Sequence, residues 1–189
     1  MPDESEVTLN SGSSLKYTRL GYRKNREVTL SGEGFFEIKK GNLFSVKTDH
    51  KTIEVLGTSF NVYSRNENFN VQCITGTVKV EIGGKNEFIL NEGQGIKAAN
   101  NQEAVIYAVE KSKSIAWIKG EFFFDSTPFS TVLNEIERQF NVKIEFKGIQ
   151  DRVYTGFFTN RDLNAALENV CLPMSLQFKI VDEKKVLIW

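Results

Sequence analysis

The chain has 189 residues, of which 40% are hydrophobic and 25% charged, with 24 basic and 24 acidic side chains. This length and composition predict a globular protein of one large or two small domains, and they exclude a disordered chain and a membrane-embedded one. Because phosphate binding needs a concentrated basic surface, a net charge of zero without a long block of one sign argues against nucleic acid as a partner.

The first half of the chain, from Glu6 to about Val109, alternates apolar and polar residues with a period of two. About eleven short alternating segments are separated by turn residues such as Gly, Asn and Asp, and no helical periodicity is sustained. Short strands with turn signals every 8–12 residues or so predict an all-β domain over residues 1–110, built as a sandwich, a barrel or a short solenoid.

Two Gly-Thr pairs interrupt strands in this half, Gly57-Thr58 in EVLGTSFNVYS and Gly76-Thr77 in CITGTVKVEI. A glycine followed by a hydroxyl residue can belong to a ligand-holding loop, or it can turn the chain between two strands. Neither pair precedes a predicted helix, as a phosphate-binding loop would. We therefore expect both pairs to turn or bulge the chain.

Near residue 110 the pattern changes, and two helical segments predict a small α+β domain over residues 114–189. The first has Pro128 in its first turn, with Ser126 or Thr127 as N-cap. Its apolar residues at helical spacing are Phe129, Val132, Leu133, Ile136 and Phe140. The second segment, in RDLNAALENVCLP, repeats this arrangement and is expected to end at Pro173.

The two helical segments belong to an internal repeat. Residues 121–146 and 155–180 align at an offset of 34 residues, as between Phe124 and Phe158. Each copy is predicted to form a strand, a helix and a second strand, and each alone would leave the apolar stripe of its helix uncovered. We expect the two copies to pack together. A final hairpin, from LQFKIV to KKVLIW, is expected to close the domain.

Residues suited to catalysis are few and scattered. His50, the only histidine, lies in a predicted turn without a neighbouring Cys, so we expect a surface residue rather than a base or metal ligand. Gly32-Glu33-Gly34 precedes a strand and lacks the third glycine of a dinucleotide loop. No catalytic residue, cofactor site or metal site is therefore expected.

The two cysteines, Cys73 and Cys171, provide no disulfide framework. We expect buried free thiols rather than a bridge between them. Cys171 lies beside Leu167 and Val170 on the predicted helix, which favours a core position over a nucleophile, because a nucleophile needs a nearby base.

Taken together, several segments resemble the periplasmic part of FecR-family anti-sigma regulators. TLNSGSSL opens the series, followed by GEGFFE at Gly32–Glu37, IEVLGTSFNV at Ile53–Val62 and LNEGQ at Leu90–Gln94. Two departures are mild: ITGTVKV replaces a commoner EG.V.V pattern, and Asn91 stands where the family often has proline. The second half, AWIKGEFFFDSTPFSTVLNEIERQFNVKIEF and TGFFTNRDLNAAL, also resembles the family and is similar to the small signalling domain of secretins and TonB-dependent transporters.

The resemblance implies a signalling mechanism. In FecR-like proteins a cytoplasmic segment holds an extracytoplasmic-function sigma factor, and one membrane helix leads to the periplasmic part. The signalling domain of a TonB-dependent outer-membrane transporter contacts that part, and the regulator relays the signal inward. By this resemblance the chain is expected to be the periplasmic sensing part, which reaches sigma factor only through a cytoplasmic segment outside these residues.

A chain with many strand edges and no catalytic constellation has main-chain donors and acceptors to offer a partner. We expect the transporter's signalling domain to pair with an edge of the C-terminal domain, either Glu121–Phe124 or Lys185–Trp189. The alternative is that the last residues only complete this domain's own sheet. The candidate contact residues are Glu121, Phe122, Phe123, Phe124, Lys185, Val186, Leu187, Ile188 and Trp189.

Two other functions stay open at the level of sequence. A carbohydrate- or surface-binding β module would predict clustered exposed aromatics, whereas the tyrosines are dispersed along the chain. A structural, secretin-like piece would share the C-terminal repeat but would lack the half that contains GEGFFE and VLGTSFNV.

Overall fold

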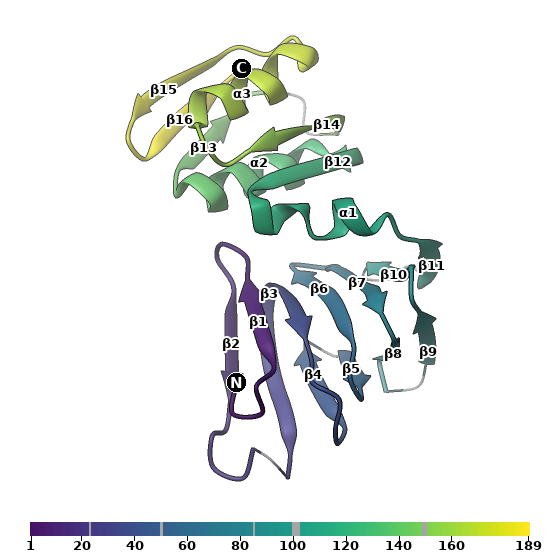
Figure 1. The fold of residues 1–189 in the computed structure, drawn as a ribbon. Coiled ribbons are helices and arrows are strands. Elements are labelled where there is room, and N and C mark those ends of the chain that lie inside the picture. Colours follow the sequence, from purple (N-terminus) through teal and green to yellow (C-terminus); the bar gives the residue numbers. More distant parts are fainter. Residues whose placement is uncertain (23, 50, 85, 100–102, 149–150) are drawn as a thin grey trace. The chain divides into compact units, whose positions relative to one another are not determined.

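The chain folds into two compact units, Met1–Ile115 and Ala116–Trp189. In this computed structural model, strands make up most of the first unit, and the second combines helices with strands (Figure 1). The structure describes residues 1–22, 24–49, 51–84, 86–99, 103–148 and 151–189.

The described part of the N-terminal unit contains eleven strands in one curled sheet, which confirms the all-β prediction. Their order is β11-β10-β7-β6-β3-β4-β5-β8-β9, and β1 and β2 both pair with β3. Because β9 also contacts β7 and β10, the sheet closes on itself around a core. The strands are β1 Glu6–Leu9, β2 Ser14–Tyr17, β3 Arg26–Glu37, β4 Phe44–Thr48, β5 Lys51–Val55, β6 Ser59–Arg65, β7 Asn68–Thr75, β8 Thr77–Ile82, β9 Asn86–Asn91, β10 Gln94–Ala99 and β11 Val105–Ala108.

The long strand β3 connects the two halves of this curl. Its first residues pair with β4 in parallel, and from Gly32 onward it pairs with β6 in antiparallel. Gly32 has a φ of +104°, which favours glycine, and a Cβ there would lie 2.5 Å from Ser13 Oγ. On either side of Gly32, β1 and β2 pair with β3 as if they were one strand interrupted at residues 10–13. The NSGS segment therefore bulges an edge strand instead of turning a hairpin.

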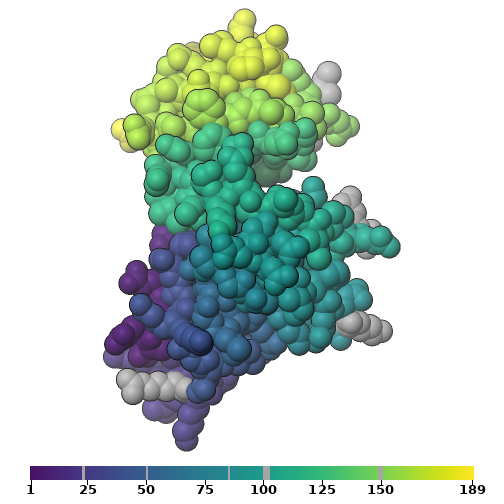
Figure 2. Space-filling model, turned by 45° about the vertical axis from the view of Figure 1, so that its right-hand side comes forward, coloured from purple at the N-terminus to yellow at the C-terminus, as the bar shows by residue number. Residues whose placement is uncertain are grey.

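Alternate residues of these strands point into the curl and form an apolar core. Phe36 of β3 and Phe60 of β6 stack inside it, with ring centroids 5.0 Å apart. The surrounding strands, purple to teal, form one continuous body of atoms in the space-filling view (Figure 2). The largest fully buried side chains of this core are Tyr22, Phe36, Phe44, Phe60, Phe69, Ile53, Leu90 and Ile96.

The two Gly-Thr pairs contact each other in the folded chain. Thr58 Oγ1 donates a hydrogen bond to the Thr77 carbonyl at 3.0 Å. Gly76 has a φ of +77°, and a Cβ there would lie 3.0 Å from Thr58 Oγ1. A Cβ on Gly57 would lie 2.7 Å from the Cα of Lys40, so the close approach of the β3–β4 connection requires glycine at position 57. Both pairs are scaffold, and their contact links the connection between β5 and β6 to the start of β8.

The C-terminal unit repeats one arrangement and then adds a strand. A strand, a helix and a strand occur twice in the same order, β12–α2–β13 and β14–α3–β15, before β16. A short α1 precedes this unit. The element bounds are α1 Lys111–Ser114, η1 Ala116–Lys119, β12 Glu121–Pro128, α2 Phe129–Phe140, β13 Lys143–Phe146, β14 Val153–Thr159, α3 Leu163–Cys171, η2 Leu172–Met174, β15 Phe178–Asp182 and β16 Lys185–Ile188.

Strands of this unit form two small sheets that both contact the helices. β12 pairs with β14, while β16 lies between β13 and β15. α2 contacts β12 and β13, α3 contacts β14 and β15, and the helices contact each other. The α+β prediction for this unit is confirmed. The core residues that are fully buried are Phe129, Val132, Ile136, Phe158, Leu167, Val170, Cys171, Val186 and Ile188.

The two helix starts differ from each other, and one differs from the prediction. The predicted N-cap at Ser126 or Thr127 is wrong, because β12 continues to Pro128 and α2 begins without a side-chain cap. The Phe129 N–H donates instead to the Arg152 carbonyl at 2.8 Å. At α3, Asp162 Oδ1 accepts a hydrogen bond from the backbone N–H three residues on, at 2.7 Å. Among the described residues, no helix combines the length and apolar character that crossing a membrane requires.

Candidate functional site

The two-stranded sheet of the C-terminal unit has an aromatic inner face. Phe122 and Phe124 of β12 both stack on Phe158 of β14, with ring centroids 4.9 and 5.7 Å apart. Tyr154 meets Phe124 edge-on at 6.0 Å and donates a hydrogen bond to the Asn169 carbonyl on α3 at 3.1 Å. This face is part of the core, so Phe122 and Phe124 act in folding.

The outer face of the same sheet exposes an aromatic pair. Phe123 is 45% exposed and Phe157 is 50% exposed, and their rings stack across the strands with centroids 5.9 Å apart. The two residues correspond within the repeat, at the same offset of 34 residues (157 minus 123). Two adjacent phenylalanines left in solvent indicate a contact surface more strongly than a single exposed apolar residue does.

Both strands of this sheet have an open edge. In the described part of the chain, β12 has one strand neighbour, β14, and β14 has no other strand neighbour either. The register is regular from Glu121 to Phe124 and is interrupted by a bulge before Thr127. The first predicted edge, Glu121–Phe124, thus has no second strand partner among the described residues, and its use by a binding partner stays a prediction.

The second predicted edge, Lys185–Trp189, is not an open edge, and that part of the prediction is wrong. β16 pairs in parallel with β13 and in antiparallel with β15. Val186 and Ile188 are fully buried, and the Trp189 backbone exchanges two hydrogen bonds with Gln177. These residues complete the domain's own sheet. Whether the half-exposed Trp189 side chain contacts a partner stays a prediction.

The prediction from sequence did not include β14. Val153 is 61% exposed and lies on the same strand as Phe157. The 34-residue offset of the repeat shows that Phe123 and Phe157 are equivalent positions. Only the pairing of β12 with β14 shows that the two residues lie side by side.

The described residues contain no group of three or more His, Cys, Asp or Glu side chains that could hold a metal ion, and His50 lies outside the described residues. Cys73 and Cys171 are free, buried thiols. Burial raises the pKa of each to about 11, so both are protonated at neutral pH and are poor nucleophiles.

Comparisons with known proteins decide the family. A model of the family described as FecR protein matches residues 1–79, and a model of the FecR C-terminal region matches residues 121–188. The chain belongs to the FecR family. The exposed phenylalanine pair therefore lies in the FecR C-terminal region.

Two solved structures are similar to this FecR-family chain over its whole length. Both are crystal structures of a proposed anti-sigma factor from Parabacteroides distasonis ATCC 8503. One is 26% identical with a TM-score of 0.90, and the other is 27% identical with a TM-score of 0.91. The chain covers 92% and 91% of their lengths. No curated protein matches the chain.

Three of the FecR-like motifs meet at one carboxylate. Asn10 of TLNSGSSL donates from Nδ2 to Glu33 Oε2 at 2.8 Å. Asn61 of VLGTSFNV donates from Nδ2 to Glu33 Oε1 at 2.9 Å. Glu33 itself belongs to GEGFFE, so a single side chain links β3, β6 and the segment between β1 and β2, which are distant in sequence. These FecR motifs are therefore structural, which matches the reading of the Gly-Thr pairs as scaffold.

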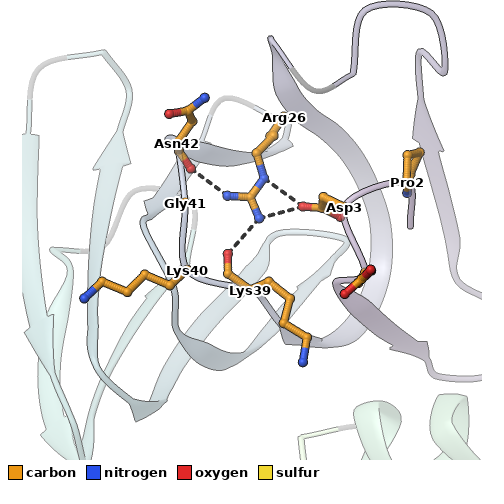
Figure 3. Close-up of a pocket in the computed structure, with 8 residues that line it drawn as sticks. Pro2, Asp3, Arg26, Lys39, Lys40, Gly41 and Asn42 are labelled. Atoms are coloured by element: carbon orange, nitrogen blue, oxygen red, sulfur yellow. Dashed lines mark hydrogen bonds and ion pairs between the residues drawn. The ribbon is translucent and has the colours of Figure 1, made fainter.

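A cavity of about 340 Å³ in the FecR-matched N-terminal region is lined by Arg26, but its guanidinium is already bonded. Nε donates to Asp3 Oδ2, Nη1 to the Asn42 carbonyl, and Nη2 to the Lys39 carbonyl, at 2.7, 2.7 and 2.9 Å (Figure 3). The Lys39 and Lys40 side chains point away from it (Figure 3). Arg26 ties the first residues of this FecR unit to the β3–β4 connection, and it offers no site for an anion.

The Asp3–Arg26 pair predicts a pH dependence. Burial raises the pKa of the Asp3 carboxyl, but hydrogen bonds from Arg26 and Ser5 and the Arg26 charge outweigh burial, so the pKa lies below its ordinary value. A lowered folded-state pKa stabilises the fold above the unfolded pKa of about 3.9, and this contribution is lost as pH falls through the folded-state value. We expect the stability of the N-terminal unit to decline below about pH 4 and Asp3→Asn to flatten that decline. Urea unfolding followed by circular dichroism across this pH range measures the decline. Identical slopes of the unfolding free energy against pH for the wild-type and Asp3→Asn proteins would contradict the prediction.

Proposed function

We propose that this chain is the sensing part of a FecR-family anti-sigma regulator, in the periplasm. It receives a signal from the signalling domain of a TonB-dependent outer-membrane transporter. The signal passes to an extracytoplasmic-function sigma factor, held by a cytoplasmic segment outside these residues. Family membership and the similarity to a proposed anti-sigma factor support the regulatory role.

One observation supports the transporter contact in particular. The FecR C-terminal region exposes the stacked Phe123–Phe157 pair on a two-stranded sheet with an open edge at β12. An added strand would satisfy the free main-chain groups of this edge and cover the two rings. The two half-exposed rings would form the apolar centre of such a contact, and surrounding residues would have to supply the rest of the buried area.

The test is binding between the full chain and the signalling domain of the transporter encoded beside its gene, measured by isothermal titration calorimetry. We expect Phe123→Ser and Phe157→Ser each to weaken the complex about tenfold or more, because each removes an aromatic anchor at the centre of the contact. The matched control is Ile89→Ser, which removes an apolar side chain that is 54% exposed on β9 of the other unit. We expect the control to leave the affinity unchanged.

Two results would count against this proposal. One is the absence of any complex between the wild-type chain and the transporter domain. The other is a complex that Ile89→Ser weakens as much as Phe123→Ser does, since binding would then depend on the N-terminal unit. Neighbouring genes provide a separate check, with a sigma-factor gene upstream and a transporter gene downstream expected.

A further inference from the structure

We propose that the strand pairing with β12 carries a basic, an apolar and a second basic residue at alternate positions, opposite Glu121, Phe123 and Asp125. This inference rests on the proposed function, because it specifies the chemistry of the same contact. It concerns what the partner must present to the open edge, which neither the family nor the fold defines.

The charges of β12 support this chemistry. Glu121 and Asp125 lie two residues before and two residues after the exposed Phe123. Among the described residues, neither carboxylate forms an ion pair. Asp125 Oδ1 only accepts a hydrogen bond from the adjacent Ser126 hydroxyl at 3.1 Å. β12 therefore carries an acidic, an aromatic and an acidic residue at alternate positions, and no described cation pairs with either carboxylate.

Within the chain's own sheets, carboxylates on a strand form ion pairs with lysines on the neighbouring strand. Lys79 of β8 binds both Glu54 on β5 and Glu87 on β9, at 3.6 and 2.7 Å. Lys185 of β16 binds Glu145 on β13 at 3.1 Å. In each case the lysine comes from the neighbouring strand, where opposite charges stabilise the pair. On the other side of β12 the described residues supply no neighbouring strand, and the proposed partner would supply it.

The same charges make a second copy of this chain a poor occupant. If two β12 strands paired in antiparallel, centred on Phe123, then Glu121 of each copy would lie opposite Asp125 of the other. Like charges directly opposite each other destabilise a strand pair. The edge thus disfavours self-association, a common hazard of open edges, and favours a basic partner strand.

Three synthetic peptides test the preference with the full chain. Each has Val at its centre and Thr at the intervening positions, and the two flanking positions carry Lys, Gln or Glu. Fluorescence anisotropy of labelled peptides measures binding at low salt and in about 1 M salt. Two cross-strand charge pairs predict that the Lys peptide binds about 2–30 times more tightly than the Gln peptide, with the Glu peptide weakest. High salt should remove the difference, because the screening length falls to about 3 Å.

Charge reversal on the protein supplies the second arm. The double variant Glu121→Lys, Asp125→Lys should reverse the order, so that the Glu peptide binds more tightly than the Lys peptide. The matched control, Glu6→Lys with Glu67→Lys, changes the net charge equally at two exposed carboxylates of the other unit, one on β1 and one in the turn between β6 and β7. We expect the control to keep the wild-type order, which separates a local effect from overall charge.

Three outcomes overturn the inference: no peptide binds, all three bind equally, or the double variant keeps the wild-type order. Concentration-dependent self-association that Phe123→Ser abolishes would also overturn it, in favour of a second copy. Binding of the transporter domain to the wild-type chain and to the double variant distinguishes failure of this inference from failure of the proposed function. If that domain binds the wild-type chain and the Lys double variant equally, only the charge preference fails. If it binds neither, the proposed function fails.

Discussion

Replacing Arg26 by Met is expected to lower the free energy of unfolding by about 3–5 kcal/mol, the usual effect of removing one partner of a buried ion pair. The Arg26 side chain is 5% exposed, and that of Asp3 is 13% exposed. Without the guanidinium, the Asp3 carboxylate and the carbonyls of Lys39 and Asn42 all lose a charged donor. Chemical unfolding followed by far-UV circular dichroism measures the loss.

A matched control separates burial from charge. Lys47→Met removes the cation of an ion pair with Glu27, whose atoms lie 2.8 Å apart but whose side chains are 50% and 36% exposed. Because exposed pairs contribute little, we expect this variant to change stability by less than about 1 kcal/mol. Equal losses for the two variants would show that Arg26 does not stabilise the unit through its buried partners.

Replacing Val186 by Pro is expected to unfold the C-terminal unit. β16 is hydrogen-bonded on both sides, so proline removes a donor from the middle of a sheet, and its ring replaces a side chain that fills the core. The lost main-chain pairing and the imperfect packing together exceed about 3 kcal/mol. Both tryptophans, Trp117 and Trp189, lie in this unit, so tryptophan fluorescence during urea unfolding reports on it directly.

The control for this variant is a proline on an edge strand of the same sheet. Val181 is 47% exposed on β15, beside a register shift between Ile180 and Asp182. Proline is tolerated at edges and bulges, so Val181→Pro should leave a cooperative unfolding transition in place. A folded Val186→Pro protein, or an unfolded Val181→Pro protein, would contradict the central position of β16.

The strands of the N-terminal unit were predictable because their signal is local. Each alternation of apolar and polar residues places one set of side chains in the core, as in FNV, where Phe60 and Val62 are fully buried. The hairpin from β15 to β16 and the helices α2 and α3 follow from the same kind of local pattern. The predicted N-cap of α2 failed because β12 extends through Ser126 and Thr127 to pair with β14, and a long-range contact prevailed over a local preference.

The candidate site was only half predictable. Glu121–Phe124 was identified as an edge, and the structure leaves that edge open. Lys185–Trp189 likewise consists of one charged residue followed by apolar residues, yet it lies in the middle of a sheet. No property of the residues within either segment distinguishes an edge strand from a central one, because pairing partners lie far away along the chain.

The amino-acid sequence by itself determined the family, the alternating strands and the repeat of strand, helix and strand, because motifs and periodicity are properties of neighbouring residues. Tertiary structure alone decided which strand edges stay open. The insertion of β16 between β13 and β15 closes one candidate edge, and the pairing of β12 with β14 alone leaves the other free. The same pairing stacks Phe123 on Phe157 in solvent, because residues related by the repeat meet only when its two copies pack together.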